Sequence, residues 1–203
     1  MIIKQADYQR IHAVINSVLL NANVNPAHRC LYFSALGAYI LDKHFNYTPD
    51  IRAGLAAYNV GGPNLLTFGE EHEGQLTGNR ESFHCWVEVD GWAIDFMAPA
   101  FASLHKEQPP IPAKMFQKPL SVMAASILDL TTEGAFYYES TPEVTARHMK
   151  VLTESRKVRD FADICVKWFK KSPGTIRRSI GIGKSKDSLR DVRLQGTPLT
   201  GVW

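Results

Sequence analysis

Hydrophobic residues recur at helical spacing in two segments near the start of the chain. Residues 30–41 are apolar nearly all round, a pattern typical of a central helix that is covered on several sides. Asn25 and Pro26 precede this segment as a capping side chain and a proline suited to the first helical position. Gly37 costs the helix about 1 kcal/mol relative to alanine, so we expect another element to approach closely there. Residues 7–21 predict an amphipathic helix with an apolar stripe formed by Ile11, Val14, Ile15, Val18 and Leu19.

Strand-like segments fill the middle of the chain. Residues 51–60 predict a strand, and the polar, glycine-rich residues 61–80 predict a long loop of the kind that often carries function. Residues 83–96 alternate between apolar and polar positions and predict a β-hairpin. Residues 135–140 predict a further strand, and one last helix is expected to begin at Thr141. This order of helices, strands and a final helix favours an α+β domain.

The turn of the predicted hairpin fixes which side chains share a face. Asp90-Gly91 favours a type I′ turn, in which both central residues have positive φ, and such a turn pairs Val89 with Trp92. Side chains alternate between the two faces of a strand. One face is therefore entirely apolar and holds Cys85, Val87, Val89, Trp92, Ile94 and Phe96. The other face holds His84, Trp86, Glu88, Ala93, Asp95 and Met97.

On the second face, His84 and Asp95 are diagonal neighbours. Residues in this relation lie about 7–8 Å apart at the backbone, within reach of an imidazole and a carboxylate that turn toward each other. Two interpretations are open at this point. The pair belongs to a catalytic site, where the carboxylate orients the ring, or it is an exposed ion pair that contributes ~0–1 kcal/mol to stability.

The composition is that of an ordinary globular protein. The 203 residues suffice for one domain with a sizeable core, and 45% of them are hydrophobic and 21% charged. No segment approaches the ~20 continuous apolar residues of a membrane span, and the N-terminus lacks the pattern of a secretory signal. The net charge of +3 is too small to indicate a nucleic-acid or membrane partner. We expect a domain of residues 1–171 followed by a basic C-terminal appendage, residues 172–203.

The three cysteines differ in how well their positions suit a catalytic nucleophile. The chain has an odd number of cysteines, Cys30, Cys85 and Cys165, and they lack C-x-x-C spacing. We therefore expect a reduced, cytoplasmic protein without a disulfide framework. Cys85 points away from His84, to the apolar face of the hairpin, and Cys165 lies in an apolar run typical of packing. Cys30 lies in the first turns of the central helix, where the helix dipole favours a thiolate. The alternative for Cys30 is a small buried hydrophobe.

Three segments together resemble a known family. RCLYFSALGAYIL, IRAGLAAYNV and HCWVEVDGWAID occur in this order between Asn25 and Met97. They resemble the transglutaminase-like branch of the papain-like cysteine enzyme superfamily, most closely bacterial transglutaminase-like proteins and lasso-peptide leader peptidases. The resemblance implies a papain-like α+β fold with a central helix packed on an antiparallel sheet. It also implies a Cys–His–Asp triad carried over to Cys30, His84 and Asp95. The region after Ala98 matches no part of the family pattern that we can place.

What the resemblance implies is acyl chemistry through a thioester on Cys30, with His84 moving the proton and Asp95 holding His84. A cysteine hydrolase, as a peptidase or amidase, is favoured, and an acyltransferase shares the same triad. The substrate would be a peptide, an amide or another acyl donor. No metal or organic cofactor is required. Trp86 and residues 61–80 are expected to line the approach to the thiol.

Three alternatives belong to other classes. The chain could be a catalytically silent binding protein that keeps the fold. Residues 167–193 carry nine Lys or Arg against two Asp, but few aromatic side chains for base stacking, so we expect no nucleic-acid partner. Cys30, His84 and Asp95 have the right chemistry for zinc, although the sequence offers no close pair of ligands to anchor the ion.

Overall fold

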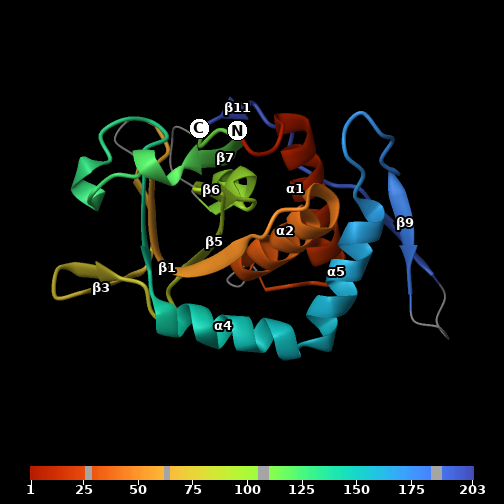
Figure 1. Ribbon diagram of the computed structural model, residues 1–203, viewed down its shortest axis with the longest axis horizontal. Coiled ribbons are helices and arrows are strands. Elements are labelled where there is room, and N and C mark those ends of the chain that lie inside the picture. Colours follow the sequence, from red (N-terminus) through yellow and green to blue (C-terminus); the bar gives the residue numbers. More distant parts are fainter. Residues whose placement is uncertain (26–28, 62–64, 105–109, 184–188) are drawn as a thin grey trace.

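The fold places a group of helices beside a mixed sheet (Figure 1). The structure, a computed structural model, describes residues 1–25, 29–61, 65–104, 110–183 and 189–203. Among these residues, the helices are α1 (Gln5–Asn21), α2 (Arg29–Phe45), α3 (Phe101–Leu104), α4 (Pro142–Glu154) and α5 (Arg156–Trp168). Short 3₁₀ turns are found at Ala98–Ala100, Leu120–Val122 and Ile127–Asp129.

The main sheet has the order β11-β7-β6-β5-β1-β2, and β8 also pairs with β1. Its strands are β1 (Asp50–Asn59), β2 (Leu65–Phe68), β5 (His84–Val89), β6 (Trp92–Asp95), β7 (Lys114–Pro119), β8 (Phe136–Ser140) and β11 (Gly201–Val202). Two smaller sheets pair β3 (Glu70–His72) with β4 (Gln75–Thr77) and β9 (Ser179–Ile182) with β10 (Arg190–Arg193). The β11–β7 pairing is parallel, and the other described pairings are antiparallel. The expected α+β class is confirmed.

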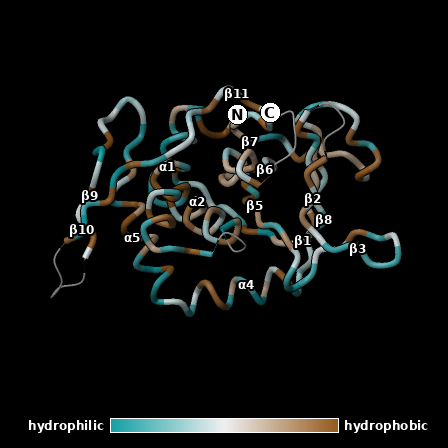
Figure 2. The backbone as a smooth tube through the Cα atoms, turned by 180° about the vertical axis from the view of Figure 1, so that it is seen from behind, coloured by the Kyte–Doolittle hydropathy of each residue, from teal (hydrophilic) through white to brown (hydrophobic). Residues whose placement is uncertain are grey.

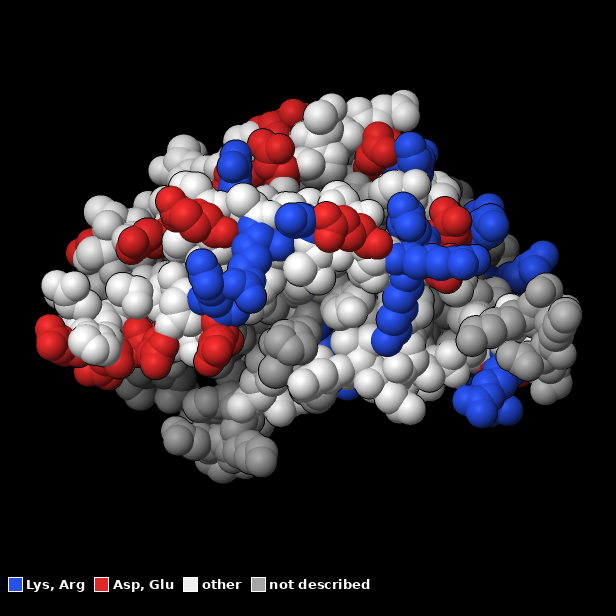
Figure 3. Space-filling view, turned by 90° about the horizontal axis from the view of Figure 1, so that it is seen from below, with Lys and Arg blue, Asp and Glu red and all other residues white. Residues whose placement is uncertain are grey.

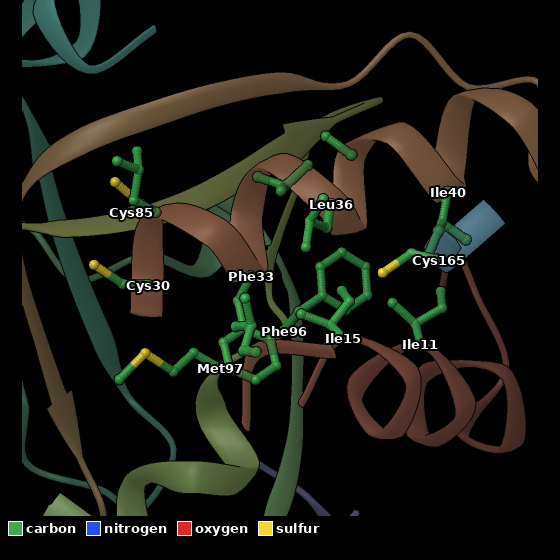
Figure 4. Packing of buried hydrophobic residues seen from close by; sticks show 14 of the residues in the cluster. Ile11, Ile15, Cys30, Phe33, Leu36, Ile40, Cys85, Phe96, Met97 and Cys165 are labelled. Atoms are coloured by element: carbon green, nitrogen blue, oxygen red, sulfur yellow. The ribbon is translucent and has the colours of Figure 1, made fainter. Parts of the chain in front are cut away.

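The first hydrophobic cluster lies between the helices and the apolar face of the hairpin (Figure 4). Helix α2 is central to it, as its nearly uniform apolarity predicts, and α1 and α5 cover its other sides. A Cβ placed on Gly37 would lie 2.1 Å from Cδ2 of Phe96, which is fully buried just after β6. The expected close approach to Gly37 is therefore confirmed, and it brings α2 against the sheet.

The hairpin has the register that its turn predicts. Asp90 and Gly91 have φ of 49° and 75°, as a type I′ turn requires. Val89 pairs with Trp92, and the described pairing of β5 with β6 ends at Val87↔Ile94.

The second face of the hairpin is also buried. A second cluster covers it with aromatic side chains from α3, which follows the hairpin closely, and from the more distant strands β7 and β8. These residues include Phe101 of α3, Phe116 of β7, and Phe136 and Tyr138 of β8. His84 and Asp95 are 0% exposed as a result. The interpretation of these two residues as an exposed surface pair is therefore wrong.

Two predictions of local structure need correction. Residues 61–80 do not form one long loop, because β2, β3 and β4 lie within the part of that segment that is described. The last helical region is two helices, α4 and α5, which meet at Ser155. Ser155 has an extended backbone, and its side chain caps α5 by accepting a hydrogen bond from the Val158 N–H. The capping position Asn25 is described, but Pro26 lies outside the described residues; α2 is described from Arg29.

The C-terminal region packs against the domain. Seen from behind, α1, α2 and α5 lie between the β9–β10 sheet and the main sheet (Figure 2). The Gln195 N–H donates to Ser17 Oγ on α1 at 2.7 Å, and β11 joins the edge of the main sheet at β7. These contacts connect the predicted basic appendage both to helix α1 and to the main sheet.

The face of the molecule in Figure 3 carries lysine and arginine side chains interspersed with aspartate and glutamate. Positive and negative side chains are therefore mixed on that face and do not gather into one large patch of a single charge. Among the described residues, none of the helices has the length and apolarity needed to cross a membrane.

Candidate active site

The structure places His84 and Asp95 in direct contact. Nε2 of His84, the first residue of β5, lies 2.7 Å from Oδ2 of Asp95, the last residue of β6. The contact follows from the hairpin register, which puts both side chains on one face. Both side chains are fully buried, so solvent does not screen the interaction.

Asp95 is held by three hydrogen bonds to its carboxylate. Besides the contact with His84, Oδ2 accepts a hydrogen bond from the Tyr58 hydroxyl at 2.7 Å, and Oδ1 accepts one from the Met97 N–H at 2.8 Å. The Tyr58 and Tyr138 hydroxyls lie 2.9 Å apart. Since the Tyr58 proton is given to Asp95, Tyr138 is the donor in this second contact. The carboxylate therefore has a fixed orientation with one lone pair directed at His84.

Tyr58 and Tyr138 are site residues that the sequence analysis missed. Burial, followed by the charge of Asp95, raises the pKa of both phenols well above the usual value, so both remain hydrogen-bond donors. The sequence contains only part of the information needed to place Tyr58 at the site. Alternation along β1 puts Tyr58 on the face of Gly54, but it takes the Gly54↔His84 pairing to show that this is the face of His84.

Aromatic side chains enclose the imidazole of His84. Phe68 of β2 stacks on the ring with centroids 4.2 Å apart, and Tyr58 and Phe101 meet it edge-on at 5.9 and 6.1 Å. Phe68 is the described residue of segment 61–80 that reaches the site. This cover excludes water from the ring and strengthens its interactions with charged groups.

Cys30 lies at the start of α2, in its first described turn. Its side chain is 4% exposed and belongs to the first hydrophobic cluster. The unpaired backbone N–H groups of a helix start favour a negative charge nearby. The expectation that Cys30 begins a buried central helix is confirmed.

Interactions with neighbouring groups lower the pKa of Cys30 to about 5. The Cys85 side chain has the largest effect; burial opposes it, and the neighbouring imidazole of His84 with its charge lowers the pKa further. Burial alone would have the opposite effect, as at Cys165, where it raises the pKa of the thiol. Cys30 therefore differs in kind from a buried cysteine that only packs.

The pKa of His84 is raised to about 9. Burial lowers it, but the charge and hydrogen bond of Asp95 outweigh burial, and Cys30 adds to their effect. Nδ1, the ring nitrogen remote from Asp95, is buried and makes no hydrogen bond of normal geometry to a described residue. Hydrogen bonds at resting catalytic sites are often long or poorly aligned. At neutral pH these pKa values describe a thiolate beside an imidazolium.

The comparisons with known proteins establish a family. The family described as "Protein of unknown function (DUF2026)" matches residues 4–203. The chain belongs to the DUF2026 family. A solved structure described as "The crystal structure of genomics APC5867" is 48% identical in sequence and superimposes with a TM-score of 0.92, covering 100% of this chain and 98% of that one. None of the curated proteins matches the chain.

The predicted role of Trp86 in this DUF2026 chain needs correction. The side chain is 0% exposed; its ring stacks on Tyr138 at 4.2 Å, and its indole N–H donates to Glu88 Oε1 at 2.9 Å. It lies on the same face as His84, as alternation predicts, but the second cluster covers that face. Trp86 therefore supports Tyr138 from within the core and does not line an approach for substrate.

The chemistry available at this site is that of an activated thiol. A thiolate, an imidazolium next to it and a carboxylate behind the ring are the parts of nucleophilic acyl transfer. The zinc alternative gains no support, because the described residues contain no group of three or more His, Cys, Asp or Glu arranged to hold a metal ion.

Proposed function

We propose that this chain is a cysteine-dependent enzyme of acyl-group chemistry, a hydrolase of peptide or amide bonds or an acyltransferase, with a papain-like fold of the transglutaminase-like kind. The observation that carries the proposal is the meeting of Cys30 with His84 and Asp95 in one buried site, where the pKa of a buried thiol is lowered to about 5. The three sequence segments that resemble the transglutaminase-like branch support it independently.

In the first half-reaction, the Cys30 thiolate attacks the carbonyl carbon of the substrate. The carbon–sulfur bond forms while the carbonyl oxygen takes up negative charge. His84 then gives its Nδ1 proton to the leaving amine or alkoxide, and the bond to the leaving group breaks to give a thioester on Cys30. Asp95 holds the ring by Nε2 throughout, so that Nδ1 stays directed at the reacting atoms.

In the second half-reaction, water or an amine attacks the thioester. His84 accepts the proton of the attacking molecule at Nδ1, and the carbon–sulfur bond breaks to restore the thiolate. The Cys30 backbone N–H, in the first turn of α2, is one donor for the negatively charged oxygen, a contribution of about 3–4 kcal/mol in other enzymes. His84 makes every proton transfer, and Cys30 carries the acyl group.

A catalytically silent binding protein is the second candidate, and one observation favours it. Cys30 is only 4% exposed and His84 is fully buried beneath Phe68, so a substrate needs a displacement of the cover to reach the sulfur. A protein that keeps the fold without turnover would have no need for an open path. The reactivity of the Cys30 thiol separates the two candidates.

Alkylation by iodoacetamide near pH 6 is the first test. At that pH an ordinary thiol is almost fully protonated, whereas Cys30 is mostly thiolate. Allowing for the lower nucleophilicity of a low-pKa thiolate, Cys30 should react on the order of tenfold faster than a cysteine peptide. Peptide mapping assigns the label, and Cys165→Ala is the matched control that leaves the rate unchanged. His84→Ala should remove the advantage; a Cys30 thiol of ordinary reactivity would favour the binding protein.

Turnover of activated esters and amides is the second test. A panel of nitrophenyl esters and nitroanilide peptides should reveal a burst of product equal to the enzyme concentration, the sign of a covalent acyl-enzyme. Cys30→Ala should abolish both burst and turnover while the circular dichroism spectrum is unchanged. Turnover that persists in that variant overturns the assignment of Cys30.

A further inference from the structure

Cys85 lies near Cys30, although the hairpin register turns it away from His84. Cys85 is fully buried, and both cysteines belong to the first hydrophobic cluster. In Figure 4 the two side chains lie at the same end of the cluster, Cys30 on the first turn of α2 and Cys85 on the neighbouring strand β5. The described pairing of β6 with β5 begins only at Val87, so the edge of β5 at residues 84 and 85 is not occupied by β6.

The pKa values of the two thiols are shifted in opposite directions. Burial, followed by the hydrogen bond and charge of Cys30, raises the pKa of Cys85 well above the usual value. Cys85 therefore keeps its proton at neutral pH, where Cys30 is a thiolate. A thiol is a weak donor to a neutral partner, but a hydrogen bond to an anion is about twice as strong as a neutral one. Cys85 is therefore the protonated thiol beside the anionic sulfur, and His84 adds its positive charge.

We propose that Cys85 is a positioning residue of this site, whose thiol donates a hydrogen bond to the Cys30 thiolate and keeps the sulfur charged and directed at His84. This inference rests on the proposed function and deepens it. It explains why a cysteine occupies an apolar face where valine and isoleucine are its neighbours. A purely structural role for Cys85, as a small hydrophobic side chain, is the competing explanation.

The test is the ionisation of Cys30 in the full chain. Ultraviolet absorbance of the thiolate is followed against pH, and the same titration of a matched variant that also carries Cys30→Ala is subtracted. The wild-type difference should titrate with a midpoint of about 5. Cys85→Ala should raise the midpoint by about one pH unit or more, a tenfold loss of thiolate below it. Cys85→Ser, which keeps a donor, should stay close to wild type.

Two controls separate donation from packing. Cys85→Val fills the space without a donor and should raise the midpoint as alanine does, also serving if the alanine variant does not fold. Cys165→Ala removes another buried thiol and should leave the midpoint unchanged. An unchanged midpoint in Cys85→Ala or Cys85→Val, with a raised one in His84→Ala, overturns the role of Cys85 and leaves the proposed function standing. Absence of a low-pH thiolate at Cys30 in the wild type overturns both.

Discussion

Tyr58 donates a hydrogen bond of 2.7 Å to Oδ2 of Asp95, the oxygen that also binds His84. One oxygen thus accepts hydrogen bonds from side chains of two strands, β1 and β5, and connects both strands to the site. Tyr138 extends the chain of hydroxyl groups by one more residue. The same arrangement that holds the carboxylate in place also makes the site a buried polar network, in which the loss of one member leaves others unsatisfied.

Replacement of Tyr58 by phenylalanine tests this network. The variant removes the donor to Asp95 and leaves the Tyr138 hydroxyl without its acceptor, so we expect a loss of about 2 kcal/mol in the free energy of unfolding. Urea denaturation measures it. The matched control is Tyr137→Phe, whose exposed hydroxyl donates to Glu139 at 3.1 Å and should cost no more than about 0.5 kcal/mol. Equal effects of the two variants contradict the prediction.

Replacement of Asp95 by asparagine tests the charge at constant shape. Without the carboxylate, the largest influence that raises the pKa of His84 is lost, and burial lowers that pKa instead. We expect the imidazole of His84 to be neutral at pH 7 in this variant, and nuclear magnetic resonance measures its protonation state. Turnover of the best ester substrate should fall on the order of 10³–10⁴-fold. Asp129→Asn, an exposed carboxylate bonded to Ser126, should change neither quantity.

The pH dependence of turnover follows from the two perturbed groups. Cys30 has a pKa lowered to about 5 and His84 one raised to about 9, so the thiolate–imidazolium form predominates between these values. Below about pH 5 the nucleophile gains a proton, and above about pH 9 the acid loses one. We expect kcat/KM to form a plateau between them and to fall on both sides. A profile that rises through pH 8–9 as an ordinary thiol ionises contradicts this assignment.

Replacement of Gly37 by alanine tests the contact that sets α2 against the hairpin. The new methyl carbon would lie 2.1 Å from Cδ2 of Phe96, and Gly37 and Phe96 are both buried. We expect a loss of about 1–3 kcal/mol in the free energy of unfolding from overpacking, although alanine favours a helix by about 1 kcal/mol. Adding Phe96→Leu should recover part of the loss, because the two sites are in contact. A more stable Gly37→Ala variant contradicts the prediction.

Local rules predicted the parts of the site that lie on one short stretch of chain. The Asp90-Gly91 turn determines the register, and the register determines that His84 and Asp95 share a face. The near-uniform apolarity of α2 likewise predicted a central helix with Cys30 near its start. These features depend on spacings of a few residues, so periodicity and turn chemistry suffice to find them.

The sequence by itself determined the α+β class, the hairpin pairing and the candidacy of Cys30. Only the tertiary structure decided that the second hairpin face is buried, that Trp86 supports Tyr138, that Tyr58 holds Asp95 and that Cys85 lies near Cys30. Each of these depends on which segments outside the hairpin cover a face: β1, β8, α2 and α3. Alternation states which side chains point the same way, but the partner that meets them is set by long-range packing, which no local pattern encodes.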